Sequence, residues 1–172
     1  MPDKRNSILL GGLVAGVLST SYLGFINFIC CLGVIVGAMT AVWHYTSNNG
    51  LTIPAGQGAG MGAAAGAIGA LIGFVLTTVL TFAAGIDANE AFFNAIIGFF
   101  ESMAADASGD QAEQLEEQIA QMEAQRDAPF SLGSALGGAA VATLISAVFG
   151  AIGGAIGAAV FKKGGRVEDY DI

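Results

Sequence analysis

Three long apolar stretches without a single Asp, Glu, Lys or Arg dominate this sequence. They run from Ile8 to about Tyr45, from Gln57 to Ala84 and from Phe130 to Phe161. The hydrocarbon core of a bilayer is about 30 Å thick, so a helix of roughly 20 apolar residues crosses it. Because each stretch is long enough for such a helix, we expect an integral membrane protein.

Composition supports the same expectation. Only 12% of the residues are charged, and the mean hydropathy is +0.67. A soluble globular domain carries about 25% charged residues. Half that density does not cover a water-facing surface of this size, so much of the surface should face lipid.

The first apolar stretch is too long for one straight span. A helix over residues 8–45 would reach about 57 Å. The polar residues between Ser19 and Asn27 are the expected place for a break. We therefore expect two spans here, at about 7–23 and 26–45. Trp43, His44 and Tyr45 then mark an interface with water, where amphipathic rings prefer to lie.

The rest of the chain predicts two further spans. A polar turn from Thr46 to Gly56 contains Asn49-Gly50 and Pro54, which are turn-forming residues. The third and fourth spans are expected at about 57–84 and 131–161. The predicted fold is an all-α integral membrane protein with four transmembrane helices in a single membrane domain, 1–172.

An acidic segment over residues 86–129 separates the third and fourth spans. Ten of the 14 acidic residues lie between Asp87 and Asp127. Apolar residues recur there at helical spacing on both sides of Ser108-Gly109-Asp110, which predicts a pair of amphipathic helices. We expect this helical segment to be extracytoplasmic. The predicted partner surface consists of Glu113, Glu116, Glu117 and Glu123, although a merely solvated helix face is the simpler interpretation.

Basic residues indicate the orientation. Lys4 and Arg5 lie near one end of the sequence, and Lys162, Lys163 and Arg166 lie near the other. Positive charge near the ends of spans favours the cytoplasmic side. Four spans place both termini in the cytoplasm, whereas three would place one basic terminus outside. The predicted location is a bacterial inner (plasma) membrane, in a multi-pass arrangement.

Glycine spacing suggests how the helices pack. The chain has 26 glycines, many of them four residues apart within the spans. Such small residues allow helix backbones to approach closely in lipid. The predicted helix-packing residues are Gly12, Gly16, Gly33, Gly37, Gly58, Gly62, Gly66, Gly150 and Gly154. They fit packing within one four-helix bundle, or an oligomerisation face along Gly58–Gly66.

No pattern indicates catalysis, a cofactor or a metal site. The adjacent Cys30 and Cys31 lie in an apolar run, which is typical of inert small residues, and zinc would need more ligands than His44 adds. An enzyme that uses Cys30 or His44 is the least favoured hypothesis. Nucleic-acid binding is not expected, because the sequence has no basic patch.

The order of segments carries a family resemblance. An N-terminal helical hairpin is followed by a polar turn with Asn49-Gly50-Leu51-Thr52, a third span, a Glu- and Gln-rich helix over residues 114–123, and a last span that ends in lysines. This order resembles the small bacterial membrane proteins grouped as domain of unknown function four-one-nine-nine. The resemblance implies four helices and no established activity. Gly58-Gly62-Gly66 is also similar to glycine-zipper membrane proteins.

Two functional hypotheses follow. The first is a non-enzymatic accessory or structural subunit of a membrane assembly, with the acidic segment as its contact surface. The alternative is a small oligomeric transporter or channel-like protein, although ion coupling usually leaves ionisable groups inside the spans. The expected partners are the lipid bilayer and either further copies of this chain or a larger membrane complex.

Overall fold

The computed structural model describes residues 3–20, 31–84, 88–126 and 132–163, whose secondary structure consists of six helices. These helices are α1 (Arg5–Leu18), α3 (Leu32–Asn49), α4 (Ala55–Ala84), α5 (Ala88–Asp106), α6 (Asp110–Arg126) and α7 (Leu132–Val160). The described part of the chain is therefore all-α, as predicted.

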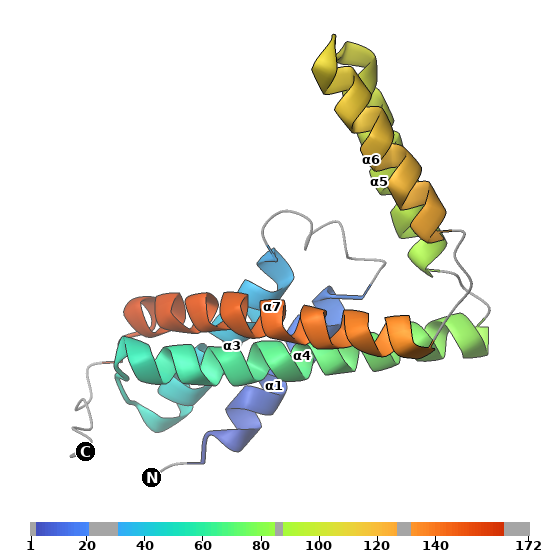
Figure 1. Cartoon of the computed structure of the whole chain (residues 1–172). Helices are drawn as coiled ribbons and strands as arrows, with labels where there is room; N and C mark the ends of the chain where they lie inside the picture. Colours follow the sequence, from blue (N-terminus) through green and yellow to red (C-terminus); the bar gives the residue numbers. More distant parts are fainter. Residues whose placement is uncertain (1–2, 21–30, 85–87, 127–131, 164–172) are drawn as a thin grey trace.

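Four of the helices form an up-and-down bundle (Figure 1). α4 and α7 lie antiparallel along each other, so that Gly58 approaches Gly154 and Gly66 approaches Ser146. α1 packs against α3 and α4, and α3 also packs against α7. As a result, the start of α1 and the end of α7 lie at one end of the bundle. The α5–α6 pair is attached at the opposite end.

The bundle helices differ in length. α4 and α7 have 30 and 29 residues, which corresponds to about 45 Å each. α1 and α3 have 14 and 18 residues, or about 21 and 27 Å. Within the described residues, α4 and α7 are long and apolar enough to cross a membrane, with mean hydropathies of 2.1 over Ala55–Ala83 and 2.0 over Leu136–Val160. α1 is apolar but shorter.

α3 continues past the predicted span end at residue 45. The Asn49 side-chain amide donates a hydrogen bond to the Tyr45 carbonyl oxygen at 2.8 Å, which supports the last turn. Gly50 then adopts a left-handed conformation with φ 64°, and the Leu51 N–H donates to the Thr46 carbonyl at 3.2 Å. This is the glycine-terminated helix end known as the Schellman motif. The predicted turn over residues 46–56 is therefore confined to 50–54.

The other helix boundaries lie at varying distances from the predictions. α4 and α7 begin and end within two residues of the predicted 57–84 and 131–161. α1 ends at Leu18, before the predicted 23. The predicted break around 19–27 and the start of the predicted 26–45 span fall largely outside the described residues.

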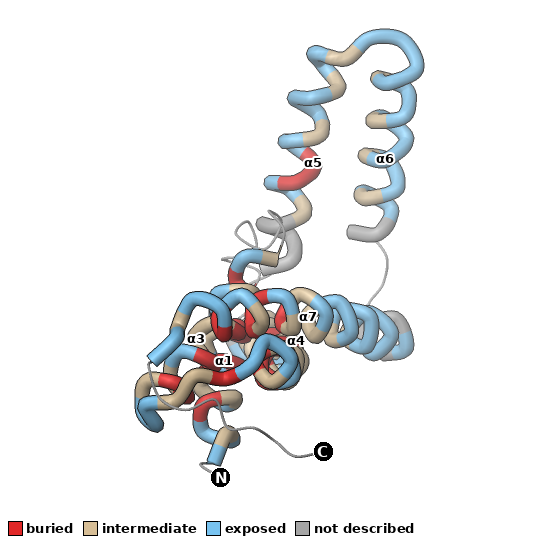
Figure 2. Tube along the Cα trace, turned by 90° about the vertical axis from the view of Figure 1, so that its left-hand side faces the viewer, coloured by how far each residue is buried: buried red, intermediate tan, exposed pale blue. Residues whose placement is uncertain are grey.

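Small residues fill the inside of the bundle, and large apolar residues cover its outside. Ala15, Ala38, Ala41 and Ala65 are completely buried. Leu144, by contrast, is 69% exposed. Figure 2 shows the buried residues where the four helices meet. Larger buried side chains gather near the α3–α4 turn, in a cluster of Val42, Tyr45, Ile53 and Met61 with Ala158.

The bundle is complete over only part of its length. α1 and α3 flank the first half of α4 and the second half of α7 (Figure 1). Residues 74–83 of α4 and 136–149 of α7 continue beyond them as a two-helix stem, and neither range contains a buried residue. The large exposed side chains of the stem are Phe74, Val75, Val79, Phe82, Leu136, Val141, Leu144, Ile145 and Val148.

α5 and α6 form a separate helical hairpin that projects from the bundle (Figures 1 and 2). Gly109 precedes α6 with φ 64°, which lets the chain reverse after α5 ends at Asp106. Asp110 and Glu113 lie in the first turn of α6, where negative charge is favoured by the helix dipole. The two helices pack on each other and make few contacts with the bundle.

Candidate functional site: a glycine-packed bundle and an acidic hairpin

The predicted glycine ridge Gly58–Gly62–Gly66 lies against α7 of the same chain. A Cβ atom added at Gly62 would meet the carbonyl oxygen of Gly150 and lie 2.7 Å from the Cα of Gly154. One added at Gly58 would lie 2.6 Å from the Cβ of Ala158. These contacts are with backbone or with the first side-chain carbon, so the neighbouring groups have little freedom to move away. Only hydrogen fits at these positions.

α1 uses two adjacent glycines to contact two different helices. A Cβ on Gly11 would lie 2.6 Å from the carbonyl oxygen of Gly37 on α3. A Cβ on Gly12 would instead lie 2.8 Å from Cγ2 of Ile68 on α4. Successive residues of a helix point about 100° apart, since a turn takes 3.6 residues. Gly11 and Gly12 therefore lie where α1 packs against both α3 and α4.

The remaining predicted packing glycines also lie in the bundle. Gly16 faces α4, where an added Cβ would be 2.7 Å from Cγ2 of Ile72. On α3, Gly37 faces α1 and Gly33 is buried. Gly150 and Gly154 face Gly62 and Gly58 across the α4–α7 contact.

Further glycines pack between these helices: Gly69, Gly153 and Gly157, which belong to four-residue glycine pairs, and Gly11, which does not. Gly153 and Gly157 face α3, with an added Cβ 2.8 Å from the Ile35 carbonyl oxygen and 3.2 Å from the Val42 Cβ. Their signal in the sequence is the same four-residue spacing, displaced by three residues from the Gly150–Gly154 pair. α7 therefore has two glycine faces, one for α4 and one for α3.

Other glycines of α4 and α7 are not in contact with a neighbouring helix. Added Cβ atoms at Gly56 and Gly60 on α4, or at Gly137 and Gly138 on α7, would have no neighbour within 4 Å. Four-residue spacing alone therefore does not identify a contact, because Gly56 and Gly60 share it with Gly58 and Gly62.

A polar link joins α1 to α3 near the start of α1. Ser7 is 3% exposed, and its Oγ lies 2.9 Å from His44 Nδ1. The other ring nitrogen, Nε2, lies 2.9 Å from the side-chain nitrogen of Asn48. Lys4 Nζ is 6.0 Å from the centre of the neighbouring Tyr45 ring. Interhelical hydrogen bonds of this kind hold helices together in an apolar environment.

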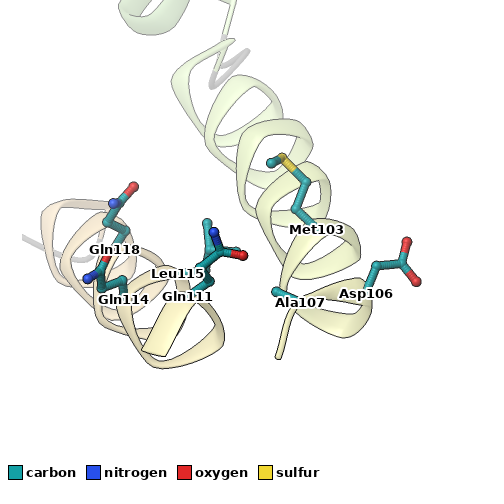
Figure 3. A pocket seen from close by; sticks show the side chains of 7 residues that line it. All are labelled: Met103, Asp106, Ala107, Gln111, Gln114, Leu115 and Gln118. Carbon is teal, nitrogen blue, oxygen red and sulfur yellow. The ribbon is translucent and has the colours of Figure 1, made fainter. Parts of the chain in front are cut away.

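The four glutamates of the predicted partner surface are exposed on α6. Glu116 and Glu123 line a cavity of about 400 Å³ together with Ile119 and, from α5, Glu101 and Ala104. A second cavity, of about 500 Å³, lies toward the hairpin tip. Figure 3 shows Gln111 and Leu115 of α6 facing Met103 of α5 and Ala107, which follows α5, there. The hairpin thus presents shallow amphipathic hollows bordered by carboxylates.

The structure shows no candidate metal site among the described residues. No three His, Cys, Asp or Glu side chains lie close enough there to hold a metal ion. Cys31 is partly buried immediately before α3 and has φ 53°. Cys30 lies outside the described residues. His44 contacts Ser7 and Asn48, so its observed role is to link helices.

Comparison with known protein families finds a match. The family model described as protein of unknown function (DUF4199) matches residues 8–163, which confirms the resemblance seen in the order of segments. No curated protein and no solved structure matches the chain.

Proposed function

The chain belongs to the DUF4199 family of proteins of unknown function, and from its structure we propose that it is a non-enzymatic membrane scaffold. In this proposal, α1, α3, α4 and α7 are four spans in a bacterial inner membrane. They anchor the α5–α6 hairpin outside the cytoplasm, where it contacts a partner protein as part of a larger membrane assembly.

The observation that carries the proposal is the inverted distribution of side-chain size. Large apolar residues such as Phe82, Val148 and Val160 are 60–73% exposed, while Ala15 and Ala65 are completely buried. Soluble proteins bury large apolar side chains and rarely expose large continuous apolar patches. Helices in lipid gain little from burying large side chains and pack instead through small residues. The bundle has the second pattern.

Helix lengths are compatible with spanning. α4 and α7, at about 45 Å, exceed the bilayer core of about 30 Å, so they tilt or extend beyond it. α1 and α3 are shorter and need adjoining residues, or a locally thinner bilayer, to complete a crossing. Their packing against α4 and α7 through Gly12, Gly16, Gly153 and Gly157 supports placing all four helices in the same layer.

The hairpin is the element suited to recognition. Its exposed carboxylates on α6 include Glu113, Glu116, Glu117 and Glu123. Because α5 and α6 make few contacts with the bundle, the hairpin surface is available on several sides. A partner that fits this surface carries basic side chains beside apolar ones. The basic side chains would complement the carboxylates, and the apolar ones would fill the hollows lined by Leu115 and Ile119.

Crosslinking from the hairpin tests the proposal. A photoreactive residue at Gln118, which is exposed on α6, should form a discrete adduct with one membrane-assembly protein in native membranes. Replacing the four glutamates by Gln should remove the adduct, whereas replacing them by Asp should largely retain it, since the charge is kept. The control carries the same photoreactive residue at Val141 on the stem. Adduct formation that is identical in the Gln variant and the wild type would overturn the proposal.

A further inference from the structure

Basic side chains from both ends of the described chain come together at one end of the bundle. Lys4 and Arg5 lie at the start of α1, and Lys162 and Lys163 follow the end of α7. One turn further into the bundle, Ile8 and Ala158 pack in the same apolar cluster around Val42 and Tyr45. This shared cluster holds the two basic pairs at the same level. Figure 1 shows the start of α1 and the end of α7 on that side.

Aromatic residues of α3 lie at the same level. Lys4 Nζ is positioned 6.0 Å from the centre of the Tyr45 ring. The neighbouring Trp43 is 48% exposed. Trp and Tyr gather at the headgroup level of membranes, and lysine side chains extend from there toward phosphate groups. The basic side chains therefore lie where headgroups would be, not in the apolar layer.

Negative charge is scarce at this end. Among the described residues, Asp3 is the acidic side chain there, and its Oδ1 accepts a hydrogen bond from the Arg5 backbone N–H at 2.9 Å. Four basic side chains against one acidic side chain leave a formal charge of 4 − 1 = +3. The hairpin acids lie at the opposite end of the bundle (Figure 1). In the sequence, residues 164–172 add one arginine and three acidic residues, which lowers the formal charge counted over both segments to +1.

We propose that this basic end, formed by Lys4, Arg5, Lys162 and Lys163, binds the headgroups of anionic phospholipids in the leaflet that it meets. The inference rests on the proposed membrane location. Arg5, Lys162 and Lys163 are exposed around the rim of an apolar bundle, and this arrangement fits several lipid headgroups held side by side. A basic cluster beside a membrane span attracts anionic lipids in this way.

Trp43 provides an internal probe. It is the only tryptophan in the chain, and it lies at the basic end. The full-length protein is reconstituted in vesicles that contain equal amounts of phosphatidylcholine and phosphatidylglycerol, with bromine atoms on the acyl chains of one lipid at a time. Because bromine quenches tryptophan over short distances, the ratio of the two quenching efficiencies reports which lipid is enriched beside Trp43.

The wild type should show stronger quenching by brominated phosphatidylglycerol. An enrichment of up to about fivefold is expected for each basic residue that reaches the headgroups. Lys162→Gln with Lys163→Gln should lower the ratio severalfold without affecting folding, because both side chains are exposed beyond α7. The matched control neutralises two exposed charges at the other end, Glu116→Gln with Glu117→Gln, and should leave the ratio unchanged.

Further conditions separate the lipid from a free anion. Raising the salt concentration from about 0.1 M to 1 M shortens the Debye length from about 10 Å to 3 Å and should reduce the preference. Inorganic phosphate and chloride at matched ionic strength should have equal effects. A selective loss of the preference with phosphate would overturn the lipid assignment in favour of a free-phosphate site.

The outcomes distinguish this inference from the proposed function. Quenching by both brominated lipids to the same extent would overturn the anionic-lipid inference but leave the membrane location standing. No quenching by either lipid would contradict the membrane location itself. A wild-type preference that persists unchanged in the Lys162→Gln, Lys163→Gln variant and in the corresponding Lys4→Gln, Arg5→Gln variant would also overturn the inference.

Discussion

Two glycines on α4, only two residues apart, have different surroundings. Gly62 lies against the backbone of α7, where an added Cβ would be 2.7 Å from the Gly154 Cα. Gly60 has no neighbour within 4 Å of an added Cβ. Glycine in a helix costs about 1 kcal/mol relative to alanine. At Gly62 that cost is offset by close contact between helices, whereas at Gly60 the structure shows no such compensation.

Substitution at these two positions should therefore have opposite effects. Gly62→Ala should lower the thermal stability of the purified protein in mild detergent, by about 1–3 kcal/mol as in overpacked cores. Gly60→Ala should leave stability unchanged or raise it by up to about 1 kcal/mol. The measurement is the unfolding midpoint of both variants under identical conditions. Equal midpoints for the two variants would contradict the α4–α7 contact.

The Ser7–His44 hydrogen bond gives a second test at the residue scale. Ser7→Ala should destabilise the protein by about 0.6 kcal/mol, the average for hydrogen bonds between membrane helices. Thr40→Ala is the control, because the Thr40 hydroxyl bonds to the Val36 carbonyl of its own helix at 2.8 Å. Its effect on the unfolding midpoint should be smaller. A Thr40→Ala effect that equals or exceeds that of Ser7→Ala would refute the link between α1 and α3.

At the scale of elements, some helix ends can be predicted from the sequence more closely than others. The bounds of α4 and α7 could be predicted closely, because uncharged apolar runs are bounded by turn-forming or charged residues. The sequence predicts too early an end for α3, because Thr46–Asn49 are polar. In the structure, Thr46 is completely buried and its hydroxyl donates a hydrogen bond to the Val42 carbonyl at 3.0 Å. Such bonds within a helix let polar residues extend it.

In the candidate site, the contacts between helices could not be predicted from the sequence. Glycine spacing indicated which helices have packing faces, but it does not say which helix each face meets. Gly11 and Gly12 face different helices, and Ser7 meets a histidine 37 residues away. Those pairings depend on how the helices are arranged in space. The acidic hairpin, by contrast, was predictable as a unit, because its apolar periodicity and the Gly109 break are local.

The α5–α6 hairpin should be separable from the bundle. Replacing residues 88–126 by a flexible Gly/Ser linker removes few contacts with α4 and none of the glycine contacts described above. The unfolding midpoint of the bundle should change by no more than a few degrees, and the partner protein should no longer co-purify with the chain. Circular dichroism with thermal unfolding measures the first effect. Loss of the folded bundle would show that the hairpin has a structural role.

At the scale of the whole molecule, charge is divided between the two ends. The basic pairs flank the start of α1 and the end of α7, and the acidic hairpin is attached where α4 ends. Positive charge favours the cytoplasmic side of a span. A bundle with an even number of spans satisfies this preference at both basic pairs simultaneously, since the up-and-down arrangement puts them at one end.

This arrangement predicts the labelling pattern of single cysteines in intact cells. In a background with Cys30→Ala and Cys31→Gly, a membrane-impermeant maleimide applied to spheroplasts should label Gln118→Cys on the hairpin. Lys163→Cys should react only after permeabilisation, because the proposed orientation places the basic end in the cytoplasm. Cys31→Gly is suited to this background, since Cys31 has φ 53° and glycine adopts that conformation without strain.

A third site distinguishes four spans from two. If α1 and α3 cross the membrane, Ser19→Cys, just after α1, lies on the hairpin side and should react from outside, together with Gln118→Cys. If only α4 and α7 cross while α1 and α3 stay on the cytoplasmic side, Ser19→Cys should react only after permeabilisation, like Lys163→Cys. The second pattern would leave a two-span protein with the same orientation of the hairpin. Labelling of Gln118→Cys and Lys163→Cys from the same side would contradict both arrangements, because it would require α7 not to cross the bilayer.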